Sequence, residues 1–183
     1  MYQLTAPEQQ ALQDVATQVG ADPASLYKLI LFESGWNPAA KNPTSSARGL
    51  IQFIDSTAQS LGYGDSLDLV TKHPTIEGQL RGPVATYLQQ WGPLDSEQAL
   101  FMAVFYPAAR TWDPNDTFPG WVTEANPGIA TPADYMDAVY AAQPVTDEQV
   151  AKAIGILPAA GMGLGLVAIA GAIIALWYMS TNT

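Results

Sequence analysis

The stretch of sequence that decides the fold is SLYKLILFESGWNP, residues 25–38. Before it, Asp22 and Pro23 form a helix-start signal, and inside it Gly35 is a typical helix stop. These signals predict a largely apolar helix that begins near Pro23, ends at Gly35 and carries Glu33 in its last turn. The predicted helix therefore presents one carboxyl group at the end of an otherwise apolar surface.

The flanking sequence predicts further helices separated by loops rich in Pro, Gly, Asn and Ser, without the alternating pattern of a sheet protein. We therefore predict a mainly α domain, with Asp55 as a helix cap and a bend at Gly82 and Pro83. The expected helices cover residues 7–19, 55–61, 74–91 and 96–106, the last at the centre of the domain, and two more begin at Thr131 and Thr146. The expected loops cover residues 37–48, 63–72 and 112–128.

The composition excludes several classes of function. The 183 residues include 17 acidic and 7 basic side chains, a formal net charge of −10, so the chain repels polyphosphates and nucleic-acid binding is not expected. There is no cysteine and His73 is the single histidine, which argues against a metal site or a catalytic triad. We therefore expect no metal and no cofactor.

The carboxyl-terminal part of the chain has a different character. No charged side chain follows Lys152, and residues 159–179 are apolar or small, about 31 Å long at the helical rise per residue. This length predicts a single C-terminal transmembrane helix with a lipid bilayer as its partner. The predicted division is a helical domain over residues 1–145, a juxtamembrane helix or linker over 146–157, the transmembrane helix over 158–179 and a short polar tail over 180–183.

Two glycines within this segment, Gly161 and Gly165, form a small-xxx-small pair. Such a pair predicts either close contact with a partner helix or simple packing in lipid. The amino terminus has neither a basic nor an apolar signal region, so we expect no secretory signal peptide. Lys152 is the basic residue that flanks the span, which favours the helical domain on the cytoplasmic side.

The placement of Glu33 suits acid catalysis. Leu26, Leu29 and Ile30 lie seven, four and three residues before it, so the carboxyl shares their apolar helix face. A carboxyl held against apolar neighbours resists ionisation and keeps its proton near neutral pH, as the acid in glycoside cleavage must. The alternative is a helix-end glutamate that pairs with a basic residue such as Arg48.

Two stretches carry a resemblance to a known family: SLYKLILFESGWNP and ARGLIQFIDSTAQSLG, residues 25–38 and 47–62. They contain, in order, Glu-Ser at a helix end, a Gly-Leu-x-Gln turn and a Thr-Ala pair. This combination resembles the lytic transglycosylase family, which has a goose-type-lysozyme-like helical fold. The resemblance implies an enzyme that cleaves the MurNAc-GlcNAc β-1,4 bond of peptidoglycan glycan strands with a 1,6-anhydro product.

The resemblance also implies roles for individual residues. Glu33 would be the catalytic acid and base, and Ser34 would help to hold the substrate or the carboxyl. Gly49, Leu50 and Gln52 would line the sugar cleft.

A third family element, Ala-Tyr-Asn-Ala-Gly, has a partial counterpart in Phe-Tyr-Pro-Ala-Ala, residues 105–109. Tyr106 and Ala108 match it, whereas Pro107 stands where the family has asparagine. The resemblance implies that Tyr106 binds substrate and hydrogen-bonds to Glu33. The alternative is a core tyrosine.

The sequence is also compatible with two other functions. A peptidoglycan hydrolase would need a second carboxylate, for which Asp55, Asp65 and Asp68 are the nearby candidates. A non-catalytic, membrane-anchored wall-binding or structural virion protein is the alternative of another class. For the aromatic side chains Trp36, Trp112 and Trp121, the choice is between stacking on sugars and packing in the core.

A wall-cutting domain beside a membrane segment restricts the expected location. We expect a bacteriophage protein in a virion membrane or genome-delivery apparatus that opens the wall locally. The alternative is a bacterial inner-membrane protein with a periplasmic domain.

Overall fold

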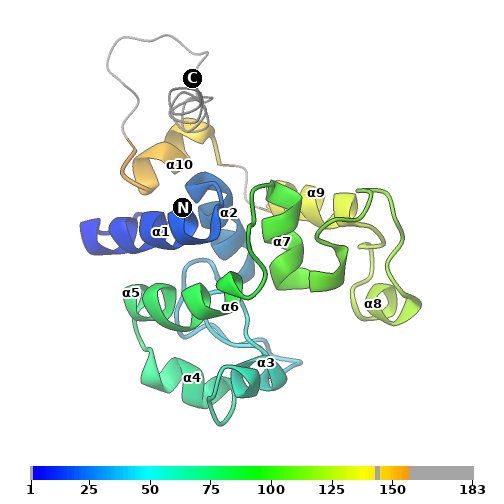
Figure 1. Ribbon diagram of the computed structural model, residues 1–183, viewed down its shortest axis with the longest axis horizontal. Coiled ribbons are helices and arrows are strands. Elements are labelled where there is room, and N and C mark those ends of the chain that lie inside the picture. Colours follow the sequence, from blue (N-terminus) through cyan, green and yellow to red (C-terminus); the bar gives the residue numbers. More distant parts are fainter. Residues whose placement is uncertain (1, 143–144, 157–183) are drawn as a thin grey trace, which may run out of the picture.

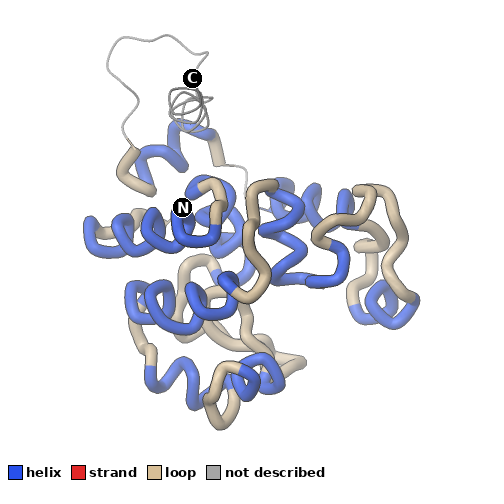
Figure 2. Tube along the Cα trace, in the orientation of Figure 1, coloured by secondary structure: helices blue, strands red, loops and turns tan. Residues whose placement is uncertain are grey.

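The computed structural model describes residues 2–142 and 145–156 (Figure 1). These residues form helices joined by loops, and within them no β-strand occurs, apart from isolated bridges that join Arg48 to Lys41 and to Phe53 (Figure 2). The predicted mainly α class is therefore confirmed for this part of the chain. The predicted transmembrane helix over residues 158–179, with Gly161 and Gly165, lies outside the described residues. No helix within the described ranges is long and apolar enough to cross a membrane.

The helices follow one another along the chain in a simple order. The first half contains α1 (Ala6–Val19), α2 (Pro23–Ser34), α3 (Asp55–Ser60), α4 (Ser66–Lys72) and α5 (Ile76–Gln79). The second half contains the π-helical turn η1 (Leu80–Val84), α6 (Ala85–Gln89), α7 (Glu97–Phe105), the 3₁₀ turn η2 (Pro107–Ala109), α8 (Gly120–Ala125), α9 (Pro132–Ala142) and α10 (Asp147–Ala153).

The first two helices begin and end where the sequence signals predict. The backbone N–H of Thr5 donates to the Glu8 carboxylate at 2.8 Å as part of a capping box at the start of α1. Asp22 caps α2 by accepting a hydrogen bond from the Ser25 N–H at 2.9 Å. Gly35 ends α2 in the left-handed conformation, with φ of 61°. The predicted position of Glu33 in the last turn of α2 is thus confirmed.

The region after residue 54 departs from the prediction in two ways. Residues 63–72 were expected to be irregular, but they contain α4, because the Asp65 side chain accepts from the Asp68 N–H at 2.7 Å and caps the helix. Asp55 is the first residue of α3 rather than its cap. Its carboxylate instead accepts from the N–H and hydroxyl of Ser66, at 3.0 and 2.7 Å.

The predicted helix over residues 74–91 is a run of α5, η1 and α6. Its π-helical turn contains Gly82 and Pro83, and proline has no N–H to donate to the preceding turn. The structure thus has a π-helical turn at the two residues where a bend was expected. The expected loop over residues 112–128 was wrong in one respect, since it contains the short helix α8.

The core of the domain gathers around α7. Leu100, Phe101, Met102 and Ala103 are each at most 1% exposed, as expected of a central helix. Helix α7 contacts α2 and α9, and Figure 1 shows α8 beyond these helices at one end of the molecule. This arrangement brings the end of α2, which carries Glu33, close to the start of α9.

Helix α10 packs against the amino-terminal helices. Val150 and Ala153 are buried, and the side-chain amides of Gln9 and Gln13 donate to the carbonyls of Ala153 and Ile154 at 3.1 and 2.8 Å. These bonds satisfy carbonyl groups at the end of α10 that lack partners in their own helix. The last described residues are thus fixed to α1.

Candidate active site

Glu33 lies at the carboxyl-terminal end of α2, and its side chain is partly buried. Leu26, Leu29 and Ile30, on the same helix face, are each 0% exposed. The predicted apolar environment of the carboxyl is therefore confirmed. Among the described residues, no lysine, arginine or histidine forms a salt bridge with Glu33. The alternative that Glu33 pairs with Arg48 was therefore wrong.

The partner of Glu33 is Tyr135 in the first turns of α9. The phenolic hydroxyl of Tyr135 donates a hydrogen bond to Oε1 of Glu33. Tyr135 is 2% exposed, and its ring is stacked on Phe105, with ring centroids 4.3 Å apart. Phe32 meets it edge-on at 5.6 Å. These rings fix the direction of the hydroxyl and hence the orientation of the carboxyl.

This finding corrects the role expected for Tyr106. The hydrogen bond to Glu33 comes from Tyr135, and the ring of Tyr106 packs instead against Trp112 and Phe118, at 5.7 and 5.6 Å between centroids. Tyr135 was missed because it lies outside the stretches that carry the family resemblance. The sequence did predict the start of the helix that carries Tyr135. At that start, the Asp134 carboxylate accepts a hydrogen bond from the Thr131 N–H at 2.9 Å.

Burial determines the protonation of this pair. It raises the pKa of Glu33 from 4.5 to about 7, and the hydrogen bond from Tyr135 opposes the shift without cancelling it. Burial and the neighbouring Glu33 carboxyl raise the pKa of Tyr135 well above its ordinary value, so its hydroxyl remains a donor. Near neutral pH, Glu33 therefore exists both as an acid and as a carboxylate.

A cleft of about 400 Å³ is lined in part by Phe105, the ring that stacks on Tyr135. Its walls come from residues 51–54, α3, α6 and the end of α7. Glu33 is not in the wall of this cleft, but Phe105 connects the two, because it lines the cleft and stacks on Tyr135. Pro107, at the position where the resemblance implies asparagine, also lines the cleft. Tyr135 and Phe105 therefore link the acid to the wall of the cleft.

The turn before the cleft is held by a buried glutamine that the sequence did not single out. Gln79 is 0% exposed, and its amide oxygen accepts from the Leu50 N–H at 2.8 Å. Its amide nitrogen donates to the carbonyl of Pro38 at 2.7 Å. Gly49 has φ of +76°, and a Cβ there would lie 2.6 Å from the Gln79 amide oxygen. Gly49 and Leu50 are thus fixed in the turn and are not part of the cleft wall.

Gln52 is the member of the predicted turn that does line the cleft. Its backbone has φ of 54°, a left-handed conformation that is unfavourable for a residue with a side chain. Its side-chain amide donates to the carbonyl of Gly49 at 2.9 Å. Strain of this kind is retained where surrounding structure enforces it, often beside a functional groove.

The remaining predicted residues have local partners. The Ser34 hydroxyl donates to the carbonyl of Ile30 at 3.1 Å, one turn earlier in α2. Trp36 is 1% exposed and its ring lies 5.2 Å from that of Tyr27, so the core alternative is confirmed for this tryptophan. The His73 ring hydrogen-bonds to the Tyr63 hydroxyl at 2.8 Å.

The carboxylates considered for a second catalytic role serve α3 and α4. Asp55 accepts from Ser66, and Asp65 caps α4. Asp68 forms a salt bridge with Lys72 at 2.7 Å. These bonds lower the pKa of Asp55 and of Asp68. Each of the three acids therefore has a structural partner.

Comparison with known proteins identifies a family model that part of the chain matches. Residues 10–74, about a third of the chain, match the family model described as Transglycosylase SLT domain. That family comprises lytic transglycosylases acting on peptidoglycan, so the prediction of an enzyme of this type is confirmed. The match contains Glu33 and Gln52 and ends before α7 and Tyr135. Neither the curated proteins nor the solved structures gave a match.

Proposed function

We propose that this protein is a peptidoglycan lytic transglycosylase that cleaves the MurNAc-GlcNAc β-1,4 bond and leaves a 1,6-anhydro end. The observation that carries the proposal is the environment of Glu33. Its carboxyl has a pKa of about 7 and one hydrogen-bond donor in Tyr135. Tyr135 in turn stacks on Phe105, which lines the cleft together with Gln52. A pKa near neutrality suits a group that must both give and accept a proton.

One carboxyl can complete this reaction. Protonated Glu33 donates its proton to the glycosidic oxygen as the bond to C1 of the muramic acid breaks. The resulting carboxylate then takes the proton of the C6 hydroxyl on the same sugar, whose oxygen closes on C1. The atoms balance without water, and Glu33 ends protonated again. Tyr135 holds the carboxyl in orientation throughout and stabilises its ionised form.

Hydrolysis is the second candidate and needs more than Glu33 alone. It requires a further carboxylate at roughly 5 to 9.5 Å to act on water or on the sugar. Asp55, Asp65 and Asp68 are each engaged in holding α3 and α4, which favours ring closure over hydrolysis.

The products distinguish these reactions. Full-length protein is incubated with purified peptidoglycan, and the released muropeptides are analysed by mass. Anhydro ends support the proposal, and reducing ends would assign hydrolysis instead. The absence of products from folded protein would point to a wall-binding or structural role. Glu33→Gln should abolish cleavage while the fold is retained, and an active variant would show that another residue is the acid.

The proposed location rests on the sequence after Lys152. We propose that residues 158–179 anchor the enzyme in a lipid bilayer, with Gly161 and Gly165 available to a partner helix. Lys152 favours a domain on the inner side of the membrane, which suits a virion membrane opened during bacteriophage genome delivery better than a periplasmic location. Detection in purified virions tests this, and a protein found in uninfected cells but absent from virions would contradict it.

A further inference from the structure

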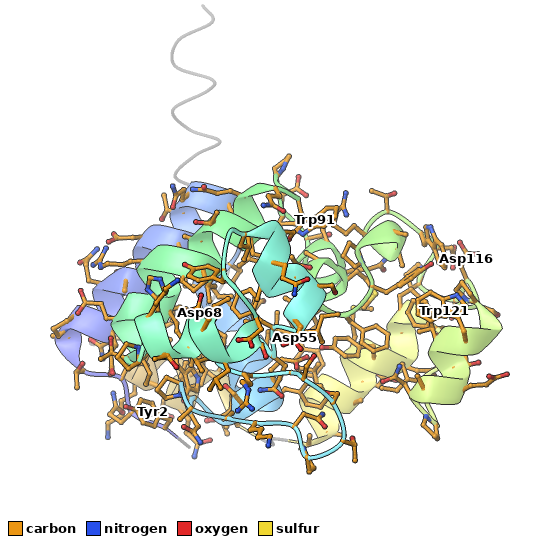
Figure 3. All side chains as sticks on the ribbon, turned by 90° about the horizontal axis from the view of Figure 1, so that it is seen from below. Tyr2, Asp55, Asp68, Trp91, Asp116 and Trp121 are labelled. Atoms are coloured by element: carbon orange, nitrogen blue, oxygen red, sulfur yellow. The ribbon has the colours of Figure 1, made fainter. Side chains whose placement is uncertain are left out.

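Trp121 is a large exposed aromatic residue that forms no aromatic pair or hydrogen bond with Glu33 or Tyr135 in the part of the chain that the structure describes. Trp121 is 66% exposed on α8. Figure 3 shows it toward one end of the molecule, whereas Trp91, in the cleft wall, lies nearer the middle. A single exposed aromatic residue is ordinary, so exposure alone carries no argument. The surroundings of Trp121 supply one.

The ring of Trp121 is part of an aromatic cluster with Tyr106, Trp112 and Phe118. Tyr106 meets Trp121 at 5.8 Å and 70°, and it also contacts Trp112 and Phe118. Tyr106 thus supports one side of the Trp121 ring while most of that ring remains open to solvent. An aromatic ring held in this way loses little freedom when a ligand stacks on it.

The segment that carries Trp121 is anchored to the domain. Phe118 is 2% exposed, and its N–H donates to the carbonyl of Ala130 at 2.8 Å. Val122, in α8, is 3% exposed. The ring of Phe118 also contacts Phe105, at 5.4 Å between centroids. Trp121 is therefore presented by a fixed segment.

The aromatic cluster contacts the wall of the cleft through Phe105, which packs against Phe118. Phe105 and Pro107, which flank Tyr106 in the chain, both line the cleft. Phe105 also stacks on Tyr135, the partner of Glu33. A polymer longer than the cleft would meet this cluster if it extends beyond Phe105 and Pro107.

The charges around Trp121 indicate the chemistry of the occupant. Residues 111–131 contain the exposed acids Asp113, Asp116 and Glu124 and no lysine or arginine. Such a surface repels phosphate and carboxylate groups and is unsuited to anionic lipid. An aromatic face carries negative charge density and attracts the C–H groups of a neutral sugar ring.

From these observations we infer that Trp121, supported by Tyr106, is a sugar-stacking site that binds a neutral pyranose of the glycan strand outside the catalytic cleft. The inference rests on the proposed function, because it assigns the same polymer to a second place on the enzyme. It also assigns Tyr106 to substrate binding through Trp121, and not through Glu33.

Binding and cleavage must be separated to test this. Full-length Glu33→Gln protein is titrated with β-1,4-linked GlcNAc oligosaccharides, which are neutral glycan strands, and the Kd is measured with and without Trp121→Ala. Loss of one aromatic anchor should weaken binding about 5- to 30-fold, and Trp121→Phe should retain most of the affinity. Leu67→Ala, at an exposed apolar residue of α4, is the matched control and should leave the Kd unchanged.

The outcomes are distinguishable. If Trp121→Ala binds glycan like its parent while the wild type cleaves peptidoglycan, the stacking site is overturned and the proposed function stands. If folded wild type neither binds nor cleaves glycan, both fail. Trp121-dependent binding to vesicles with anionic lipid, without binding to glycan strands, would overturn the sugar assignment.

Discussion

The hydroxyl of Tyr135 donates a hydrogen bond to the carboxyl of Glu33, across 102 residues of sequence. The acid comes from α2 and its donor from α9, and α7 packs against both helices. The family match covers α2 but ends before α9. The orientation and proton affinity of the acid therefore depend on a part of the chain that the match does not reach.

Replacing the hydroxyl tests this dependence. Tyr135→Phe keeps the ring stacked on Phe105 but removes a bond that lowers the pKa of Glu33. We expect kcat to fall about tenfold, the effect of one lost hydrogen bond to a catalytic carboxyl. The alkaline limb of the pH–rate profile should move to higher pH. Tyr140→Phe, on the same helix, is the control, and an alkaline limb that stays in place would contradict the assigned role.

The raised pKa of Glu33 should also appear in stability. The pKa is about 7 in the folded chain against 4.5 as the ordinary value, so folding retains a proton that the unfolded chain releases. The contribution of the protonated Glu33–Tyr135 pair to the free energy of unfolding is fully present below pH 4.5. It is lost as the pH rises through 7.

Glu33→Gln should therefore match the wild type near pH 5 and exceed its free energy of unfolding by about 2 kcal/mol at pH 8. Urea denaturation at the two pH values measures the difference. Glu124→Gln, at an exposed glutamate, controls for the loss of one negative charge. An equal gap at both pH values would mean that Glu33 is not protonated by folding.

Local signals made the helices around the acid predictable. Asp22 and Gly35 bound α2 through contacts within a few residues, and the apolar face around Glu33 follows from helical spacing. Asp55 was misassigned because its partner, Ser66, lies in a helix that the sequence pattern did not indicate. Tyr135 was missed because its selection depends on how α2 and α9 pack. Capping and periodicity are local properties, whereas the second member of the catalytic pair is decided by tertiary contacts.

Gly49 should tolerate alanine poorly for two separable reasons. It has φ of +76°, and an added Cβ would lie 2.6 Å from the amide oxygen of Gln79, which holds the turn through Leu50. Gly62 has a similar φ of +88° but no atom within 4 Å of an added Cβ. Gly62→Ala should thus cost about 1 kcal/mol from the backbone alone, and Gly49→Ala clearly more. If thermal denaturation shows the same loss of stability in both alanine variants, the Gln79 side chain moves away from the added Cβ without an energetic cost.

Gln52 allows backbone strain and cleft chemistry to be told apart. Gln52→Gly and Gln52→Ala both remove the amide that lines the cleft and bonds to Gly49. Only glycine adopts φ of 54° without steric cost, so the glycine variant should be more stable by about 0.5–1 kcal/mol. If the amide contacts the glycan, both variants should lose cleavage activity to the same extent despite this difference. Activity that recovers in Gln52→Gly in step with its stability would show that Gln52 serves the turn and not the substrate.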